Sequence, residues 1–267
     1  MPTVSARGFE LYYEEHGRGE PLVLVPGFGA GLWIWYRQVP GFAERFRTIV
    51  FDPRGVARSA ADAPFTMRDL ADDLAALLEE LRVEEAHVLG ASFGGFVAQE
   101  FALAHPALVR SLVLCCTSYG GAGHRPPSAE TLAAIASTKG LNTEERVREN
   151  LLLAFSPRFA AEHAQEVERV TRLRAENVVP EHVYLRQLQA AFAFDAAARV
   201  GGIEAPTLVI TGDEDVIVPH ENSLNLAAAI PGARLRVIEG GSHAFFIERA
   251  EEFNRAVVEF IEQLESV

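Results

Sequence analysis

A serine lies between glycines in the segment V-L-G-A-S-F-G-G-F-V, residues 88–97, where an apolar stretch typical of a strand changes to a helical pattern. Gly90, Ser92 and Gly94 fit the spacing G-x-S-x-G. A serine on a very sharp strand-to-helix turn needs neighbours without side chains, because otherwise the turn cannot close. The spacing therefore predicts a nucleophilic hydroxyl at Ser92. The alternative is a flexible glycine loop in which Ser92 only caps the helix.

A serine hydroxyl is a weak nucleophile until a base takes its proton, and the base needs a third group to hold its tautomer. Among the eight histidines, His243 differs from the others because it follows the last predicted strand in the glycine-rich loop G-G-S-H-A-F-F, residues 240–246. That loop lies at the carboxyl edge of the predicted sheet, on the same side as Ser92. We therefore expect His243 to be the base. The alternative is a loop histidine with a structural hydrogen bond.

The acid is sought in T-G-D-E-D-V-I-V-P, residues 211–219, which follows another predicted strand. Asp215 is the better candidate, because the Val-Ile-Val-Pro that follows would bury and orient it. Asp213 lies nearer the glycine turn and is expected to cap backbone amides. The resulting order, serine then Asp215 then His243, is the order named for the G-x-S-x-G fold. Agreement among these independent features favours hydrolase chemistry over a capping loop.

Short, continuously apolar stretches recur along the chain with helical patterns between them, which is typical of parallel strands covered on both faces. Residues 9–15 alternate instead and precede the turn G-R-G-E, which predicts an antiparallel edge hairpin. Apolar residues at helical spacing, mainly leucines in the first case, predict helices over residues 67–81 and 253–264. This alternation implies a doubly wound α/β sheet with its site at the carboxyl ends of the strands. The apolar strand candidates are residues 22–25, 48–52, 86–90, 111–116, 206–212 and 235–239.

The alternation of strand and helix patterns is interrupted once. Residues 118–200 begin with a turn-rich segment and then carry only helical patterns. A stretch of ~80 residues is far longer than one crossover needs. We therefore expect residues 118–200 to form a helical cap, inserted into an α/β core made of residues 1–117 and 201–267. The alternative is a set of ordinary crossover helices.

Composition excludes several classes of function. Lys and Arg number 24 against 37 Asp and Glu, a formal charge of −13, which disfavours binding to nucleic acid or to an anionic membrane. No apolar run approaches the ~20 residues of a membrane span, and the first residues lack a signal pattern, so a cytoplasmic protein is expected. Cys115 and Cys116 are adjacent, which suits neither a disulfide framework nor a metal site. Composition carries no information on the oligomeric state.

With these motifs in place, the chain resembles the α/β-hydrolase superfamily, in its cap-bearing serine hydrolase branch of small carboxylesterases, enol-lactonases, cofactor-free haloperoxidase/perhydrolases and carbon–carbon hydrolases. The resemblance runs nearly end to end. It implies a mostly parallel eight-stranded sheet with a helical cap, a Ser-His-Asp triad, and neither metal nor cofactor. Besides G-A-S-F-G-G it rests on P-G-F-G-A-G (26–31), D-P-R-G-V-A-R-S (52–59), G-D-E-D-V-I-V-P (212–219) and G-G-S-H-A-F-F-I-E (240–248).

An acyl-transfer intermediate carries an oxyanion that needs two donors, usually backbone N–H groups. One should be the amide of Phe93, which directly follows the nucleophile at a helix N-terminus. The resemblance implies that the second is the amide of Phe28. Relatives usually have His-Gly where this chain has Pro26-Gly27, which leaves the geometry of that loop in question.

A second departure lies in residues 52–59, where Ala57 replaces a glycine common in the pattern D-x-R-G-x-G-x-S. Asp52 and Arg54 of this segment are expected to be structural, as an ion pair that braces the loops. They are therefore kept out of the catalytic set.

We expect an apolar pocket between the strand ends and the cap. Each aromatic candidate could also be ordinary core. No cation stands out as a carboxylate clamp, although Arg125, Arg158 and Arg186 lie in the cap. The main pocket candidates are Trp33, Phe155, Phe159, Phe192 and Phe245, with Phe28, Trp35, Phe93, Phe194 and Phe246 beside them.

The sequence thus predicts a serine hydrolase that cleaves carboxylic esters of small, largely apolar substrates through an acyl-enzyme on Ser92. One alternative keeps the triad but takes a lactone, an enol-lactone or a diketone whose carbon–carbon bond is cleaved. Another is a ligand receptor on a hydrolase scaffold, in which cap movement recruits a partner.

Overall fold

The computed structural model describes residues 2–137 and 143–265 of the chain. Within these ranges eight strands form one sheet in the order β1-β2-β4-β3-β5-β6-β7-β8. From β4 to β8 in this order each strand is parallel to the next, whereas β2 pairs antiparallel with both β1 and β4. The doubly wound α/β fold is therefore confirmed. The strands are β1 (Thr3–Ala6), β2 (Phe9–His16), β3 (Pro21–Val25), β4 (Arg47–Phe51), β5 (Ala86–Ala91), β6 (Val109–Cys115), β7 (Thr207–Gly212) and β8 (Arg234–Ile238).

The antiparallel edge differs from the expected hairpin. Strand β2 pairs with β1 before it, through a turn in which Arg7 and Gly8 both have positive φ, and with β4 on its other side. The turn G-R-G-E leads from β2 to β3, but β3 pairs with β4 and β5. The prediction that residues 9–15 form an antiparallel strand near the edge is therefore confirmed, but the prediction of a hairpin at G-R-G-E was wrong. The reason is that β3 is apolar on both faces, so it lies inside the sheet and not beside an edge strand.

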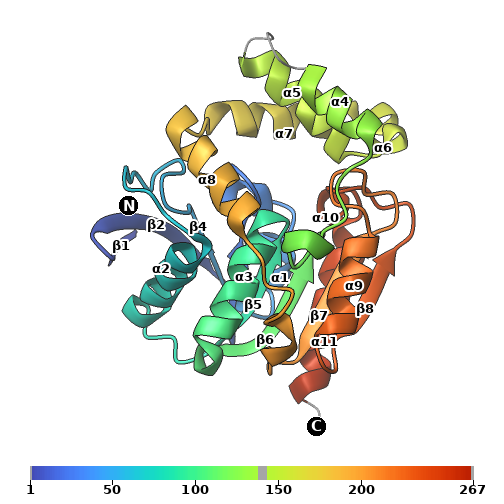
Figure 1. The fold of residues 1–267 in the computed structure, drawn as a ribbon. Coiled ribbons are helices and arrows are strands. Elements are labelled where there is room, and N and C mark those ends of the chain that lie inside the picture. The colour runs from blue at the N-terminus through green and yellow to red at the C-terminus, as the bar shows by residue number, and fades with distance from the viewer. Residues whose placement is uncertain (1, 138–142, 266–267) are drawn as a thin grey trace.

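Helices cover both faces of this sheet (Figure 1). Two separate clusters of buried residues, one on each face, form the core. One face is covered by α2, α3 and α9, and the other by α1 and α11. These helices are α1 (Val39–Phe42), α2 (Met67–Glu80), α3 (Phe93–Ala104), α9 (Glu221–Ala229) and α11 (Ala250–Glu265).

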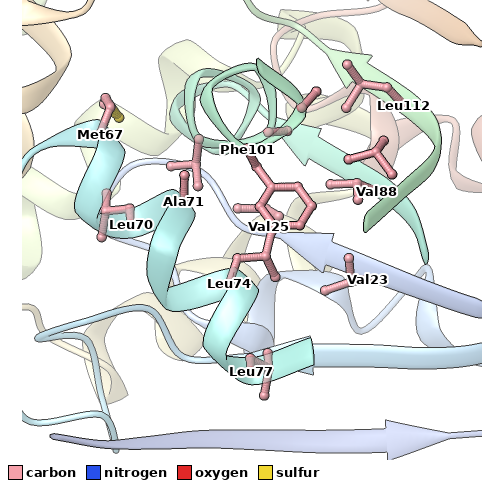
Figure 2. Packing of buried hydrophobic residues seen from close by; sticks show 14 of the residues in the cluster. Val23, Val25, Met67, Leu70, Ala71, Leu74, Leu77, Val88, Phe101 and Leu112 are labelled. Carbon is pink, nitrogen blue, oxygen red and sulfur yellow. The ribbon is translucent and has the colours of Figure 1, made fainter. Parts of the chain in front are cut away.

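The helical pattern of α2 explains the first cluster. Leu74 and Leu77 project from one side of α2 toward Val23 and Val25 of β3, and Phe101 of α3 packs beside them (Figure 2). Glu79 and Glu80 of α2 are exposed as the sequence predicts, whereas Asp73 is buried. This packing fixes α3, and therefore the turn that precedes it, against β3 and β5.

Among the described residues between β6 and β7 there are five α-helices, in the segment expected to be a cap, and we keep the name cap for residues 118–200. Figure 1 shows α4 to α7 above the carboxyl ends of the strands, while α8 runs down toward α3. In residues 2–137 and 143–265, no helix combines the length and apolarity needed to cross a membrane. The cap helices are α4 (Ala129–Ser137), α5 (Thr143–Ala154), α6 (Pro157–Glu162), α7 (Ala164–Glu176) and α8 (Glu181–Ala193).

The two glycines of G-x-S-x-G are required by the close approach of backbone segments. A Cβ atom added to Gly90 would lie 2.3 Å from the carbonyl oxygen of Gly94, and one added to Gly94 would lie 2.2 Å from that of Val25. Both partners are backbone atoms that cannot rotate away. The first turn of α3 is thus packed against β3 and β5 at a distance that only glycine allows.

Substitution Gly94→Ala is expected to lower the free energy of unfolding by about 1–3 kcal/mol or more, because α3 must move away from β3 to admit the methyl group. Urea denaturation of wild type and variant measures this change. Gly202→Ala is the control, since its added Cβ atom would have its nearest neighbour 3.9 Å away. The control should stay within about 0.5 kcal/mol of wild type. Equal stability of the two variants would contradict the close-packing account.

Candidate active site

Ser92 stands at the junction of β5 and α3 with φ 54° and ψ −118°, a backbone conformation that residues other than glycine rarely adopt. Three hydrogen bonds hold it there. Its N–H donates to the carbonyl of Cys115 (2.8 Å), and its carbonyl accepts from Thr117 Oγ1 and from Gly95 N, both at 2.8 Å. The Ser92 side chain makes no capping bond to α3. The hydroxyl is therefore available for another partner, unlike in the capping alternative.

That partner is His243, which lies in the loop after β8. Its Nε2 atom is 3.1 Å from Ser92 Oγ, and its Nδ1 atom is 2.7 Å from Asp215 Oδ2. Asp215 lies in the loop after β7, so all three side chains come from the carboxyl ends of strands. The structure thus brings together the three residues that the sequence selected from separate segments.

Asp215 is held by the chain that follows it. Its Oδ1 atom accepts hydrogen bonds from the backbone N–H groups of Ile217 (2.9 Å) and Val218 (2.8 Å), and only 5% of the residue is exposed. The other oxygen then faces His243 Nδ1. A proton on Nδ1 leaves Nε2 as the acceptor for the serine hydroxyl, which is the tautomer that a general base needs. Asp213, in contrast, accepts from Gly240 N (2.7 Å) and braces the histidine loop.

The charge on Asp215 governs the titration of the histidine. Burial of the ring lowers the pKa of His243, but the Asp215 carboxylate outweighs burial and raises that pKa to about 9. Cys116 lies beside both groups, and burial raises the pKa of its thiol well above the ordinary value. The thiol is therefore uncharged at neutral pH, and the carboxylate is the charge that stabilises protonated His243.

A general base must be neutral to accept a proton. We therefore expect kcat/KM for an uncharged ester to rise with pH and to reach its plateau only above the His243 pKa of about 9. Below that value the rate should fall tenfold per pH unit. Values of kcat/KM measured between pH 6 and pH 10 determine this acid limb of the pH profile. A profile that is already flat between pH 7 and pH 9 would contradict an ionised Asp215 against the ring.

Two backbone N–H groups flank the serine. The N–H of Phe93 is at the first position of α3, where helical N–H groups have no acceptor within the helix. The N–H of Phe28 lies in the loop after β3, and a Cβ atom on the neighbouring Gly27 would be 3.6 Å from Ser92 Cβ. Across the described residues, neither N–H donates to a protein acceptor. Both groups are therefore available to a developing oxyanion.

A cavity of about 960 Å³ opens in front of the serine and histidine. It lies within the ~300–1,000 Å³ range of small-molecule sites. Its wall comes from the loop after β3, from the cap helices α5, α7 and α8, and from α10 (Phe245–Glu248) after the histidine loop. Most of the lining is apolar. The aromatic lining residues are Phe28, Trp33, Trp35, Phe155, Tyr184 and Phe246.

Three of the five main pocket candidates do not line this cavity. Phe159 stacks on the outer side of Phe155, with ring centroids 5.5 Å apart. Phe245 is fully buried in the core against Phe253. Phe192 is 83% exposed, because α8 buries its opposite face. Helical periodicity alone could not show which face of a cap helix meets the core.

Two further aromatic candidates also lie elsewhere. Phe194 is buried in a stack with Phe96, with ring centroids 4.7 Å apart. Phe93 packs edge-on to the ring of Phe28, with its own side chain outside the lining of the large cavity. Both side chains therefore serve packing.

The expected Asp52–Arg54 ion pair does not form. Arg54 pairs with the buried Asp73 of α2 (Nε to Oδ2, 2.7 Å). Asp52 accepts from Arg58 Nε (2.7 Å) and from the backbone N–H of Leu32 (3.0 Å). The two residues leave β4 in different directions, so each braces a different neighbour. The bond to Leu32 holds the far end of the loop that carries Phe28.

The sequence did not reveal the cap residues that reach this loop. Arg174 of α7 and Gln187 of α8 contact its backbone, and Arg174 also lines the cavity. The three cap arginines named from the sequence instead lie near surface acids: Arg125 near Glu221, Arg158 near Glu162 and Arg186 near Asp62. Within a helical pattern, no spacing signal separates an arginine that faces the loop from one that faces water.

Comparisons with known proteins agree with this fold. The family described as "alpha/beta hydrolase fold" matches residues 20–250. The chain is 32% identical over 266 residues to the Azorhizobium caulinodans protein named "Putative carbamate hydrolase RutD", covering 99% of this chain and 100% of that protein. Its fold is similar to that of an enol-lactonase from Burkholderia xenovorans (TM-score 0.85, 26% identity, 98% and 100% coverage). It is also similar to a thermophilic esterase from Thermogutta terrifontis (TM-score 0.83, 28% identity, 98% and 96% coverage).

Proposed function

The chain belongs to the alpha/beta hydrolase fold family, and from this premise we propose that it hydrolyses carboxylic esters of small, largely apolar substrates through an acyl-enzyme on Ser92. The observation that carries the proposal is a continuous hydrogen-bonded relay that opens into an apolar cavity. The relay runs from Ser92 Oγ to His243 Nε2 and from His243 Nδ1 to Asp215. The serine and the histidine both line the cavity.

In the proposed mechanism, Ser92 Oγ attacks the ester carbonyl carbon while its proton passes to His243 Nε2. Asp215 stabilises the imidazolium that forms. The carbonyl oxygen becomes an oxyanion that accepts hydrogen bonds from the N–H groups of Phe28 and Phe93. Collapse of this intermediate breaks the bond to the alkoxy oxygen, which takes the proton from His243 and leaves as the alcohol.

The second half of the reaction repeats these roles with water. His243 takes a proton from a water molecule that attacks the acyl carbon, and the same two N–H groups stabilise the second oxyanion. Release of Ser92 Oγ with the returned proton yields the carboxylic acid and the free enzyme. The cavity of about 960 Å³ gives the acyl and alcohol groups an apolar site.

A lactone is the second candidate, because the relay acts on a cyclic ester by the same steps and the enol-lactonase relative is 26% identical over 98% of this chain. A carbamate differs only in the nitrogen attached to its carbonyl. The name of the 32% identical relative adds carbamates to the substrates that should be tested. Cleavage of a carbon–carbon bond in a diketone would also use the same serine and histidine.

The test is a panel of p-nitrophenyl esters from acetate to decanoate, set beside simple lactones and p-nitrophenyl carbamates. We expect rapid turnover of esters, with a chain-length optimum that reports the usable depth of the cavity. A preference of about 100-fold or more in kcat/KM for a lactone or a carbamate would move the function to that class. Wild-type protein that leaves every member of the panel intact would contradict the proposal.

A further inference from the structure

The loop that carries the Phe28 donor is a tight turn. Its ends are joined by a hydrogen bond from Ala30 N to the carbonyl of Gly27 (3.1 Å). Gly29 is the third residue of this turn and has φ +59°. A positive φ at the third residue is typical of a type II turn, in which the middle peptide is flipped relative to the common type I turn. The middle peptide joins Phe28 to Gly29, so its orientation decides the geometry of the whole turn.

Two cap side chains hold both polar atoms of this middle peptide. The N–H of Gly29 donates to Gln187 Oε1 at 2.7 Å. The carbonyl of Phe28 accepts from Arg174 Nη1 at 3.3 Å, and the same nitrogen also donates to the carbonyl of Gly29. The turn belongs to the core, whereas the two side chains come from α7 and α8 of the cap.

The burial of Gln187 indicates that this contact is specific. Only 1% of the residue is exposed, and it lies on the same buried face of α8 as Val183 and Ala190. A polar side chain in an apolar stripe is costly unless it is hydrogen-bonded. Its bond to Gly29 N provides that compensation. An apolar residue would pack as well on α8 but would leave the Gly29 N–H without an acceptor.

The charge and the position of Arg174 also indicate a specific contact with this turn. Among the described residues Arg174 forms no ion pair with an acid, and burial lowers its pKa to about 10, so it remains charged at neutral pH. Its charge is directed at the carbonyl groups of the turn. A Cβ atom on Gly29 would lie 2.4 Å from Arg174 Nη2, so the guanidinium occupies the space that a side chain at position 29 would need.

We infer that Gln187 and Arg174 are positioning residues, which clamp the Phe28–Gly29 peptide and thereby aim the Phe28 N–H at the oxyanion. This inference rests on the proposed function. The turn has four residues and closed ends, so a restraint on its middle peptide also restrains the preceding peptide, which carries the donor. The oxyanion hole then depends on the docked cap.

The test compares binding of a transition-state analogue with binding of substrate. An alkyl trifluoromethyl ketone is attacked by Ser92 Oγ, whose proton passes to His243, and its carbonyl oxygen becomes an oxyanion in the hole. Its inhibition constant therefore depends on how well the N–H donors are oriented toward the oxyanion. KM for p-nitrophenyl butyrate depends instead on how the pocket binds the substrate. The variant is Gln187→Met, which keeps the side-chain length and removes the acceptor.

Loss of a whole oxyanion donor costs about 10²–10³ in kcat, so a misaimed donor should cost about tenfold or more. We expect Gln187→Met to lower kcat and to weaken ketone binding by this factor, while KM stays within about twofold. Gln187→Glu keeps the acceptor and should restore most of both. Thr171→Val is the matched control, because its buried hydroxyl bonds within α7 to Val167 O and does not reach the turn.

Arg174→Met provides a second variant if Gln187→Met fails to fold by circular dichroism. Because Arg174 also lines the cavity, its KM is expected to change as well, but kcat and ketone binding should fall by a larger factor than KM rises. Parallel changes in KM and in ketone binding, or losses no larger than those of Thr171→Val, would overturn the clamp. Failure of the proposed function would look different, since wild type itself would then neither hydrolyse the ester nor bind the ketone.

Discussion

Replacement of Ser92 by alanine is expected to lower kcat for p-nitrophenyl butyrate by about 10⁶-fold, the size of the effect when a triad nucleophile is removed. The methyl group cannot form the acyl-enzyme, so only the donors at Phe28 and Phe93 remain to assist direct attack by water. KM should change little, because the cavity wall is unaltered. Steady-state rates at a pH above the His243 pKa of about 9 measure the effect at its fullest.

Ser223→Ala is the matched control for this substitution. Ser223 is a fully buried serine that does not line the cavity, and its hydroxyl donates to the carbonyl of Thr117 (3.3 Å). Its loss should leave kcat within about threefold of wild type, since it lies outside the relay. Residual activity of Ser92→Ala close to that of the control would show that another group performs the chemistry.

The second large effect is expected from Asp215→Asn, which should lower kcat by about 10⁴-fold. The amide can present an N–H to His243 Nδ1, and this favours the tautomer in which Nε2 carries the proton and cannot accept one from Ser92. The substitution also removes the charge that raises the pKa of His243. The acid limb of the remaining activity should therefore move to lower pH.

Asp213→Asn separates this effect from a general disturbance of the loop. Asp213 lies two residues away and accepts from Gly240 N, a bond that an asparagine oxygen can replace. We expect the control to keep its rate within about threefold and its acid limb unmoved. If both variants lost activity equally, with the same pH profile, the orienting role of Asp215 would be wrong.

The parts of the site that could be predicted from the sequence are those determined by residues close together in the chain. Gly90 and Gly94 are short-range requirements of one turn, and both close backbone approaches involve the turn or an adjacent strand. Asp215 follows the apolar strand β7 and His243 follows the edge strand β8, so their place at the carboxyl edge follows from the alternation of strands and helices. In these cases a run of a few residues contains all the information needed.

The side-chain contacts of the cap could not be predicted from the sequence. Either face of a cap helix could be the buried one, and which face is buried depends on residues far away in the chain. Phe155 faces the cavity and Phe192 faces water, although both are aromatic residues of amphipathic segments. The role of Gln187 likewise depends on its hydrogen bond to Gly29, which lies 158 positions away in the chain. The ion pairs show the same limit, since Arg54 turns toward Asp73 of α2 and away from its neighbour in the motif.

Covalent labelling tests the central claim most directly, namely that Ser92 is the activated nucleophile. Diethyl p-nitrophenyl phosphate should release one p-nitrophenolate per chain and leave one diethylphosphoryl group, which peptide mass mapping places on Ser92. Ser92→Ala should release none, and Asp215→Asn should react far more slowly than wild type. Folded wild-type protein that stays unmodified, or that carries the label on another residue, would contradict the account.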